Sequence, residues 1–188
     1  LSLPRDRATI LYVGRVSRVK RIEVLIDACM YVAQSGNRVS LALYGPVLDS
    51  DYYEELKQRI RGNGLERAIT FYPGVSQSML PELYATHGVC VNTTDSGSFD
   101  NTILESACCE IVSLASNTNW GSMVGAQWKS QVTFREYDAI DLAEKILHIY
   151  SLSEIEYTRM TQELSRITRE AHSLKALITR ITPYLCKK

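Results

Sequence analysis

Apolar runs long enough to cross a bilayer are absent from this 188-residue chain, since a spanning helix needs about 20 apolar residues in succession. No secretory signal precedes Pro4, so we expect a cytoplasmic protein. The charges balance, with 21 Lys and Arg against 21 Asp and Glu. A neutral chain lacks the positive field that nucleic-acid-binding proteins use, and we expect no nucleic-acid partner.

Disulfide and metal-binding patterns are also missing. The chain has an odd number of cysteines, without the paired spacing of disulfide-rich domains: Cys29, Cys90, Cys108, Cys109 and Cys186. The three histidines are scattered, and no Cys/His cluster has the spacing of a zinc site. We therefore expect free thiols, no metal and no other cofactor.

Glycine occurs ten times, but not in the arrangements that mark two common nucleotide sites. The chain has neither the G-x-G-x-x-G fingerprint of dinucleotide-binding domains nor the G-x-x-x-x-G-K-[ST] loop of P-loop proteins. No Ser-His-Asp arrangement or G-x-S-x-G elbow is visible either. These absences argue against NAD binding and P-loop hydrolysis, and they give no support to serine-hydrolase chemistry.

Short apolar runs alternate with amphipathic segments along the chain. Strands are predicted at 9–13, 39–44, 68–72, 89–92, 110–115 and 132–134. Helices are predicted at 22–33, 51–61, 77–86, 102–108, 139–151, 153–169 and 172–182. The stretch 116–130 predicts a loop with one helical turn, and the helix 77–86 should turn Met79, Leu80, Leu83 and Tyr84 inward. The alternation predicts an α/β, Rossmann-like fold with about six parallel strands flanked by helices.

One polar turn stands out, where the strand 89–92 leads into the helix that starts near Thr102. A helix N-terminus offers unpaired N–H groups and partial positive charge, which suit a phosphate. Glu105 follows one turn later and could accept hydrogen bonds from ribose hydroxyls. In the alternative interpretation, Asp100 or Ser98 merely caps an ordinary helix and Glu105 is solvated.

A second turn, 14–20, follows the first strand and is rich in basic residues. Gly14 permits a tight bend, Arg15 can contact phosphate with two hydrogen bonds, and Lys20 adds a point charge near the next helix. Arg18 and Arg21 are interpreted as solvated. An ordinary surface loop would carry the same residue types, so this turn alone leaves both interpretations open.

The polar turns share a place in the expected fold. Gly14, Gly45, Gly74–Val75 and 96–101 each follow a strand. Because parallel strands end at the same edge of a sheet, ligands of such folds bind there, near the point where the strand order reverses. The sequence therefore predicts one shared pocket.

Several stretches carry a family resemblance by their order and spacing. They are I-L-Y-V-G-R-V-S-R-V-K-R-I-E-V-L-I-D-A at 10–28, L-A-L-Y-G-P at 41–46, Y-Y-E-E-L at 52–56, I-T-F-Y-P-G-V at 69–75, L-P-E-L-Y at 80–84 and G-S-F-D-N-T-I-L-E-S-A-C at 97–108. With them the chain resembles, over roughly residues 7–150, the C-terminal, nucleotide-sugar-binding domain of family-4 retaining glycosyltransferases of the GT-B fold.

The resemblance implies a metal-independent transferase that moves a sugar from a UDP-, GDP- or ADP-sugar to an acceptor in glycan or polysaccharide biosynthesis. Arg15 and Lys20 would bind the diphosphate and stabilise the leaving group, and no residue is assigned as catalytic beyond that. Glu105 would hold the ribose, and the segment around Val75 would lie beside the base. The candidate substrate-binding residues are Gly14, Arg15, Lys20, Gly45, Val75, Gly97, Ser98, Phe99, Asp100, Asn101, Thr102 and Glu105.

In domain terms, residues 1–188 would form a single donor-binding domain with a helical tail at 153–188. The acceptor domain of the family lies N-terminal and is not in this chain; peripheral membrane association would come through it. Because catalysis needs both reactants held in geometry, the isolated domain should be inactive.

The chain departs from the family pattern at two positions. Gly97 stands where family members carry the first of two glutamates, and Glu110 stands at a usual glycine. Asp95 or Asp100 could replace the first glutamate. Two alternatives follow: a nucleotide-sugar epimerase of the same GT-B architecture, and a degenerate, non-catalytic interaction lobe.

Overall fold

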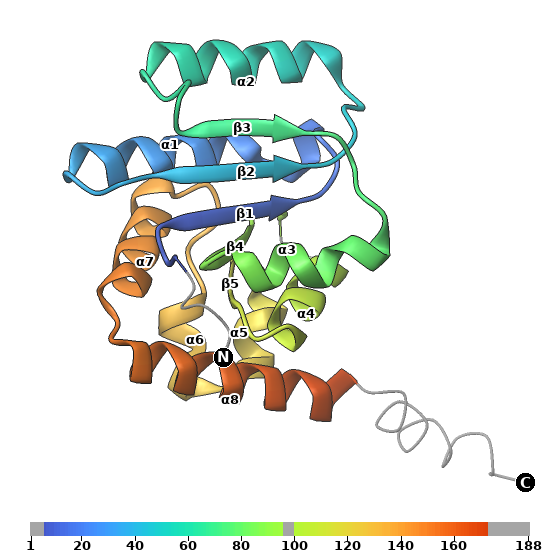
Figure 1. Ribbon diagram of the computed structural model, residues 1–188, viewed down its shortest axis with the longest axis vertical. Helices are drawn as coiled ribbons and strands as arrows, with labels where there is room; N and C mark the ends of the chain where they lie inside the picture. The colour runs from blue at the N-terminus through green and yellow to red at the C-terminus, as the bar shows by residue number, and fades with distance from the viewer. Residues whose placement is uncertain (1–5, 96–99, 173–188) are drawn as a thin grey trace, which may run out of the picture.

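Five parallel strands form the centre of the structure, a computed structural model that describes residues 6–95 and 100–172 (Figure 1). They are β1 (Thr9–Val13), β2 (Ser40–Tyr44), β3 (Ile69–Tyr72), β4 (Val89–Asn92) and β5 (Val112–Ala115). The order is β3-β2-β1-β4-β5. The strands β2 and β3 are therefore added on one side of β1 and β4 and β5 on the other, and the strand order reverses between β1 and β4. Every pairing is parallel, which confirms the predicted Rossmann-like α/β fold.

Helices connect the strands and cover both faces of the sheet (Figure 1). They are α1 (Ile22–Gln34), α2 (Ser50–Gly62), α3 (Leu80–Thr86), α4 (Asn101–Cys108), α5 (Thr118–Val124), α6 (Ala126–Val132), α7 (Ala139–Ser151) and α8 (Glu154–His172). Short 3-10 helices at Arg18–Lys20 and Gln77–Met79 precede α1 and α3.

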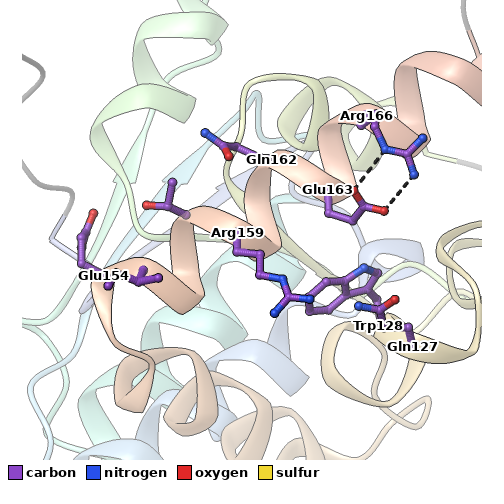
Figure 2. A pocket seen from close by; sticks show the side chains of 9 residues that line it. Gln127, Trp128, Glu154, Arg159, Gln162, Glu163 and Arg166 are labelled. Atoms are coloured by element: carbon purple, nitrogen blue, oxygen red, sulfur yellow. Dashed lines mark hydrogen bonds and ion pairs between the residues drawn. The ribbon is translucent and has the colours of Figure 1, made fainter.

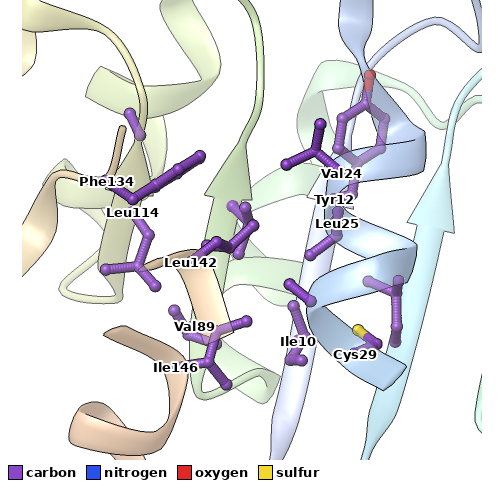
Figure 3. Packing of buried hydrophobic residues seen from close by; sticks show 14 of the residues in the cluster. Ile10, Tyr12, Val24, Leu25, Cys29, Val89, Leu114, Phe134, Leu142 and Ile146 are labelled. Atoms are coloured by element: carbon purple, nitrogen blue, oxygen red, sulfur yellow. The ribbon is translucent and has the colours of Figure 1, made fainter. Parts of the chain in front are cut away.

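Burial on both faces explains why β1, β4 and β5, the strands at and beside the strand-order reversal, are mostly apolar along their whole length. Side chains alternate along a strand, so Ile10 and Tyr12 enter the larger core, whereas Leu11 enters a smaller one with Tyr84 and Cys90. In Figure 3 the strands lie beside the helices that cover the larger core. Each large apolar side chain buried there stabilises the fold by about 1.5–3 kcal/mol relative to exposure.

The predicted sixth strand at 132–134 is wrong as a strand. Val132 is still the last residue of α6, and only Thr133 pairs with the sheet, through an isolated parallel bridge to Ala115. Phe134 N–H donates to the carbonyl of Ala115 at 3.3 Å. The segment therefore reaches the edge of β5, but α6 already includes Val132, and too few residues remain to form a strand.

The predicted loop at 116–130 is also wrong, because two helices occupy it. Asn117 caps α5, its side chain accepting the Asn119 N–H at 2.8 Å. Gly125, at φ 79°, separates α5 from α6. Trp120 and Trp128 are buried under these helices, and that burial favours helix over the weak local propensity.

Two predicted boundaries differ in detail. The strand expected from residue 110 begins at Val112, because Glu110 has a left-handed backbone, φ 56°, and belongs to the turn after α4. In the segment 77–86, Tyr84 is buried, but Met79 is half exposed rather than inward, because it sits in the 3-10 turn before α3.

The tail is helical as far as it is described. On α8, Met160 and Leu164 are buried against this lobe, whereas Ile155 is largely exposed. Arg169 donates to the Cys108 carbonyl at 2.6 Å and so ties α8 to α4. The helix predicted at 172–182 and Cys186 lie outside the described residues.

Candidate functional site

The loops after β1 and β2 lie backbone against backbone at the carboxyl edge of the sheet. Gly14 N–H donates to the Tyr44 carbonyl and Val16 N–H to the Pro46 carbonyl, both at 2.9 Å. A Cβ on Gly45 would lie 1.8 Å from the Gly14 carbonyl oxygen. Glycine is thus the residue that allows this close approach.

A phenol from the core supports the turn that carries Arg15. The Tyr12 hydroxyl donates to the Arg15 carbonyl at 3.2 Å, and a Cβ on Gly14 would lie 2.8 Å from that hydroxyl oxygen. Burial raises the pKa of Tyr12, so the phenol stays a donor. The Arg15 side chain is exposed and has no ion pair with a described residue, so its guanidinium is available to an anion.

Lys20 lies between the loops after β1 and β4. Its Nζ contacts the Asp100 carboxylate and lies 3.2 Å from the Thr94 hydroxyl oxygen. The side chains of Lys20 and Asp100 are only 12% and 15% exposed. Burial of Asp100 raises the pKa, but the hydrogen bond from Lys20 and further donors outweigh it and hold the pKa of Asp100 below its usual range. An ammonium group has three donors, so one is left beyond these two contacts with described residues.

Asp100 also caps α4. Its Oδ1 accepts the Thr102 N–H at 3.4 Å and the Thr102 hydroxyl at 3.1 Å, and the Asn92 amide donates to the Thr102 oxygen at 3.2 Å. Asn101 is exposed at the first position of the helix. The ordinary helix cap is therefore present, and the capping carboxylate is at the same time the partner of Lys20.

Glu105 is not a solvated surface residue. It is partly buried, and the hydroxyl of the buried Tyr84 donates to its Oε2 at 3.4 Å. Burial is the main cause of the raised pKa of Tyr84, which keeps the phenol protonated as a donor. Asp100 caps α4 and Glu105 lies within it, five residues further along the chain, so the Glu105 carboxylate follows the Lys20–Asp100 pair by little more than one helical turn.

The interpretation of Arg21 as solvated is wrong. Its Nε lies 3.7 Å from Asp95 Oδ2, and its guanidinium carbon lies 5.1 Å from the ring centroid of Tyr137. Arg18, although half exposed, pairs with Asp49 and Glu55. These partners are distant in sequence, and no local pattern predicts them.

The remaining candidates lie near the ends of β2 and β3 or are not described. A hollow of about 380 Å³ is lined by Gly45, Pro46, Val47, Tyr53, Phe71, Tyr72, Pro73 and Gly74. Tyr44 and Tyr72 stack beside it with ring centroids 4.6 Å apart. Val75 is partly buried and directly follows Gly74, one of the residues that line this hollow. Gly97, Ser98 and Phe99 lie outside the described residues.

A larger hollow lies elsewhere, between α6 and α8 (Figure 2). It measures about 810 Å³, and none of its lining residues belongs to the loops after β1 to β4. Figure 2 shows Arg159 and Glu163 of α8 on the side of the indole of Trp128, whereas Gln162 points away from it. It is an open groove on another side of the molecule, separate from the polar turns.

The described part of the chain has neither a metal-binding cluster nor a membrane-spanning helix. No group of three or more His, Cys, Asp and Glu residues is arranged to hold a metal ion there. In the same residues, no helix has the length and hydrophobicity required to cross a bilayer.

Fold and site together define a Rossmann-like lobe whose basic and acidic loops meet at one sheet edge, at the reversal of strand order between β1 and β4. The sequence matches the family "Glycosyl transferases group 1" over residues 1–166. The chain therefore belongs to the group 1 glycosyl transferases, as the C-terminal lobe of a GT-B fold. No curated protein gives a significant match.

Solved structures of low sequence identity share the fold. Anabaena Alr3699/HepE in complex with UDP and glucose has a TM-score of 0.81 and 20% identity over 96% of this chain and 48% of its own. The catalytic domain of cholesterol-alpha-glucosyltransferase from Helicobacter pylori has 0.73 and 22%, over 90% and 100%. The C-terminal domain of Francisella tularensis LpcC has 0.76 and 16%, over 88% and 86%. This chain thus spans about half the length of the Anabaena protein.

Proposed function

We propose that this chain is the donor-binding lobe of a retaining glycosyltransferase that transfers a sugar from a nucleotide sugar. The observation that carries the proposal is the contact of Lys20 with Asp100, the residue that caps α4, at the strand-order reversal. Arg15 lies in the turn after β1 that also leads to Lys20, and Glu105 lies within α4. The Anabaena relative, which was crystallised with UDP-glucose, supports the same class of ligand.

In the proposed binding mode the diphosphate lies between the exposed guanidinium of Arg15 and the remaining donor of Lys20. Both cations offset the charge that develops on the leaving nucleoside diphosphate, a form of electrostatic stabilisation. Glu105, oriented by the Tyr84 hydroxyl, accepts the two ribose hydroxyls. The base lies towards Gly45 and Val75.

Transfer to an acceptor is proposed for the whole protein and not for this lobe. The acceptor would bind an N-terminal domain, which would also provide any peripheral membrane contact, and residues 153–188 would form the helical tail of the single domain described here. Because the reactants must be held together, the isolated lobe should bind donor but turn over little.

One observation favours a second candidate, a degenerate lobe used for interaction. Asp100 already neutralises Lys20 without any ligand, and this opposes a second anion. Sugar transfer by the full-length protein would exclude a non-catalytic role. A nucleotide-sugar epimerase remains a third candidate, and its product would be the free epimerised sugar or nucleotide sugar rather than a glycoside.

Calorimetric titration of UDP, GDP and ADP into the chain tests the proposal. Arg15→Ala and Lys20→Ala should each weaken binding of the preferred nucleotide by about 1.5–3 kcal/mol, the range for hydrogen bonds to charged groups. Arg61→Ala and Lys57→Ala, which remove the same charges from α2, should leave the affinity unchanged. Wild-type affinity in both site variants would contradict the proposed diphosphate site.

A further inference from the structure

Arg21 joins the 3-10 helix Arg18–Lys20 to α1 through a left-handed backbone. Its φ and ψ are 48° and 41°, and its N–H donates to the Arg18 carbonyl at 3.1 Å. The next residue, Ile22, is the first of α1. The backbone of this one residue therefore sets the direction of the helix that ends at Lys20 relative to α1.

A left-handed backbone is unfavourable for arginine. Glycine adopts it readily, whereas a Cβ at the same position comes too close to the backbone. Such a conformation persists only where the surroundings enforce it. Among the described residues, only Glu110 and Tyr137 share a positive φ without being glycine. The Arg21 side chain makes no capping hydrogen bond to the start of α1, so the contacts that enforce its backbone lie elsewhere.

The Arg21 side chain is held by two residues that are distant in sequence. Its Nε lies 3.7 Å from Asp95 Oδ2, and its guanidinium carbon lies 5.1 Å from the ring centroid of Tyr137. The Tyr137 hydroxyl donates to the same Asp95 oxygen at 2.6 Å. A lone ion pair between such partly exposed side chains would contribute little. Here each of the three side chains contacts the other two, and together they tie the start of α1 to the loops after β4 and before α7.

The loop after β4 also holds Lys20 itself. The Thr93 hydroxyl donates to the Lys20 carbonyl at 2.5 Å, and Lys20 Nζ lies 3.2 Å from the Thr94 hydroxyl oxygen. Three consecutive residues of this loop, Thr93, Thr94 and Asp95, therefore contact two consecutive residues, Lys20 and Arg21. A change of backbone direction at Arg21 would move Lys20 relative to this loop.

We propose that Arg21 is a positioning residue for Lys20. Its left-handed backbone, enforced by Asp95 and Tyr137, holds the Lys20 ammonium group beside the start of α4, where the diphosphate is proposed to bind. This inference rests on the proposed function and deepens it, because it assigns the orientation of Lys20 to a residue that does not touch the ligand.

The test compares two substitutions that remove the same charge and the same side-chain contacts. Glycine adopts the left-handed backbone without the penalty that alanine has. Arg21→Ala should weaken binding about three- to tenfold, within the range of coupling in contact networks, and Arg21→Gly should stay within about twofold of wild type. The measurement is calorimetric titration with whichever of UDP, GDP and ADP wild type binds most tightly. Equal affinities of the two variants, or weaker binding by Arg21→Gly, would overturn the proposal, because charge or side-chain contact would then matter and backbone direction would not.

Tyr137→Phe tests the enforcing contact with a smaller change, since it removes only the hydroxyl group. It should weaken binding about two- to threefold when residue 21 is arginine and have no effect in an Arg21→Gly background, where nothing needs enforcing. Tyr31→Phe, at an exposed tyrosine of α1, is the matched control and should leave the affinity unchanged. The same Tyr137→Phe effect in both backgrounds, or none in either, would contradict the proposal. This comparison decides even if Arg21→Ala does not fold.

A third comparison asks whether the effect passes through Lys20. In a Lys20→Ala background, Arg21→Ala and Arg21→Gly should bind the nucleotide equally, and a remaining difference would overturn the positioning role. If Lys20→Ala weakens binding but the two Arg21 variants do not differ, the positioning inference is wrong while the proposed function stands. If wild type binds none of UDP, GDP and ADP, both are wrong.

Discussion

Replacing Gly45 by alanine tests the frame on which the proposed site is built. The new Cβ would lie 1.8 Å from the Gly14 carbonyl oxygen, whereas even close carbon–oxygen contacts are about 3.3 Å. The loops after β1 and β2 must therefore separate by about 1.5 Å. That shift takes two hydrogen bonds, now 2.9 Å long, beyond the range of a real hydrogen bond.

The loss of these two bonds should cost about 1–3 kcal/mol of unfolding free energy, at about 0.5–1.5 kcal/mol each. For a domain of this size that corresponds to a melting temperature lower by about 2–12 °C. Gly62→Ala is the matched control: it lies at the end of α2 with no atom within 4 Å of the new Cβ, and should be neutral or slightly stabilising. Differential scanning calorimetry measures both. A Gly45→Ala variant that melts with wild type and keeps its nucleotide affinity would refute the close packing of the loops.

Two further predictions concern the carboxylates of α4. The pKa of Asp100 is lowered in the folded state, so its contribution to stability is fully present above its ordinary pKa and is lost as the pH falls through the folded value. Asp100→Asn should lower the melting temperature at pH 7, and the difference from wild type should shrink as the pH falls below the ordinary pKa of an aspartate. The same variant frees Lys20 and should bind UDP a few-fold more tightly in calorimetry, and weaker binding would contradict the competition between Asp100 and phosphate. Glu105→Gln should cost about 1–2 kcal/mol of nucleotide affinity and reduce the preference for ribose over 2′-deoxyribose; an unchanged preference would remove Glu105 from the site.

The sheet was predictable because its strands are short apolar runs that end in glycine or polar turns, and this pattern is local. The polar turns were predicted to lie near a reversal of strand order, but the sequence did not predict that the reversal lies between β1 and β4. The segment 116–130 was not predictable in the same way, since its helices depend on burial of Trp120 and Trp128 against distant elements.

The candidate site likewise has residues that a local sequence pattern predicts and contacts that depend on the tertiary structure. Gly14, Gly45 and Lys20 could be chosen from sequence because glycine and basic residues at strand ends have specific uses. The contacts of Asp100 with Lys20, 80 residues away, and of Asp95 with Tyr137, 42 residues away, are tertiary. No spacing or propensity encodes them, and Arg21 was misread for that reason.

The most direct test of the central claim is a crystal structure of this chain with UDP. The account predicts the diphosphate at the carboxyl edge of β1 and β4, within hydrogen-bonding distance of Lys20 and Arg15, with the ribose hydroxyls on Glu105. UDP bound instead in the groove between α6 and α8 (Figure 2), or anywhere else away from Lys20, would contradict it.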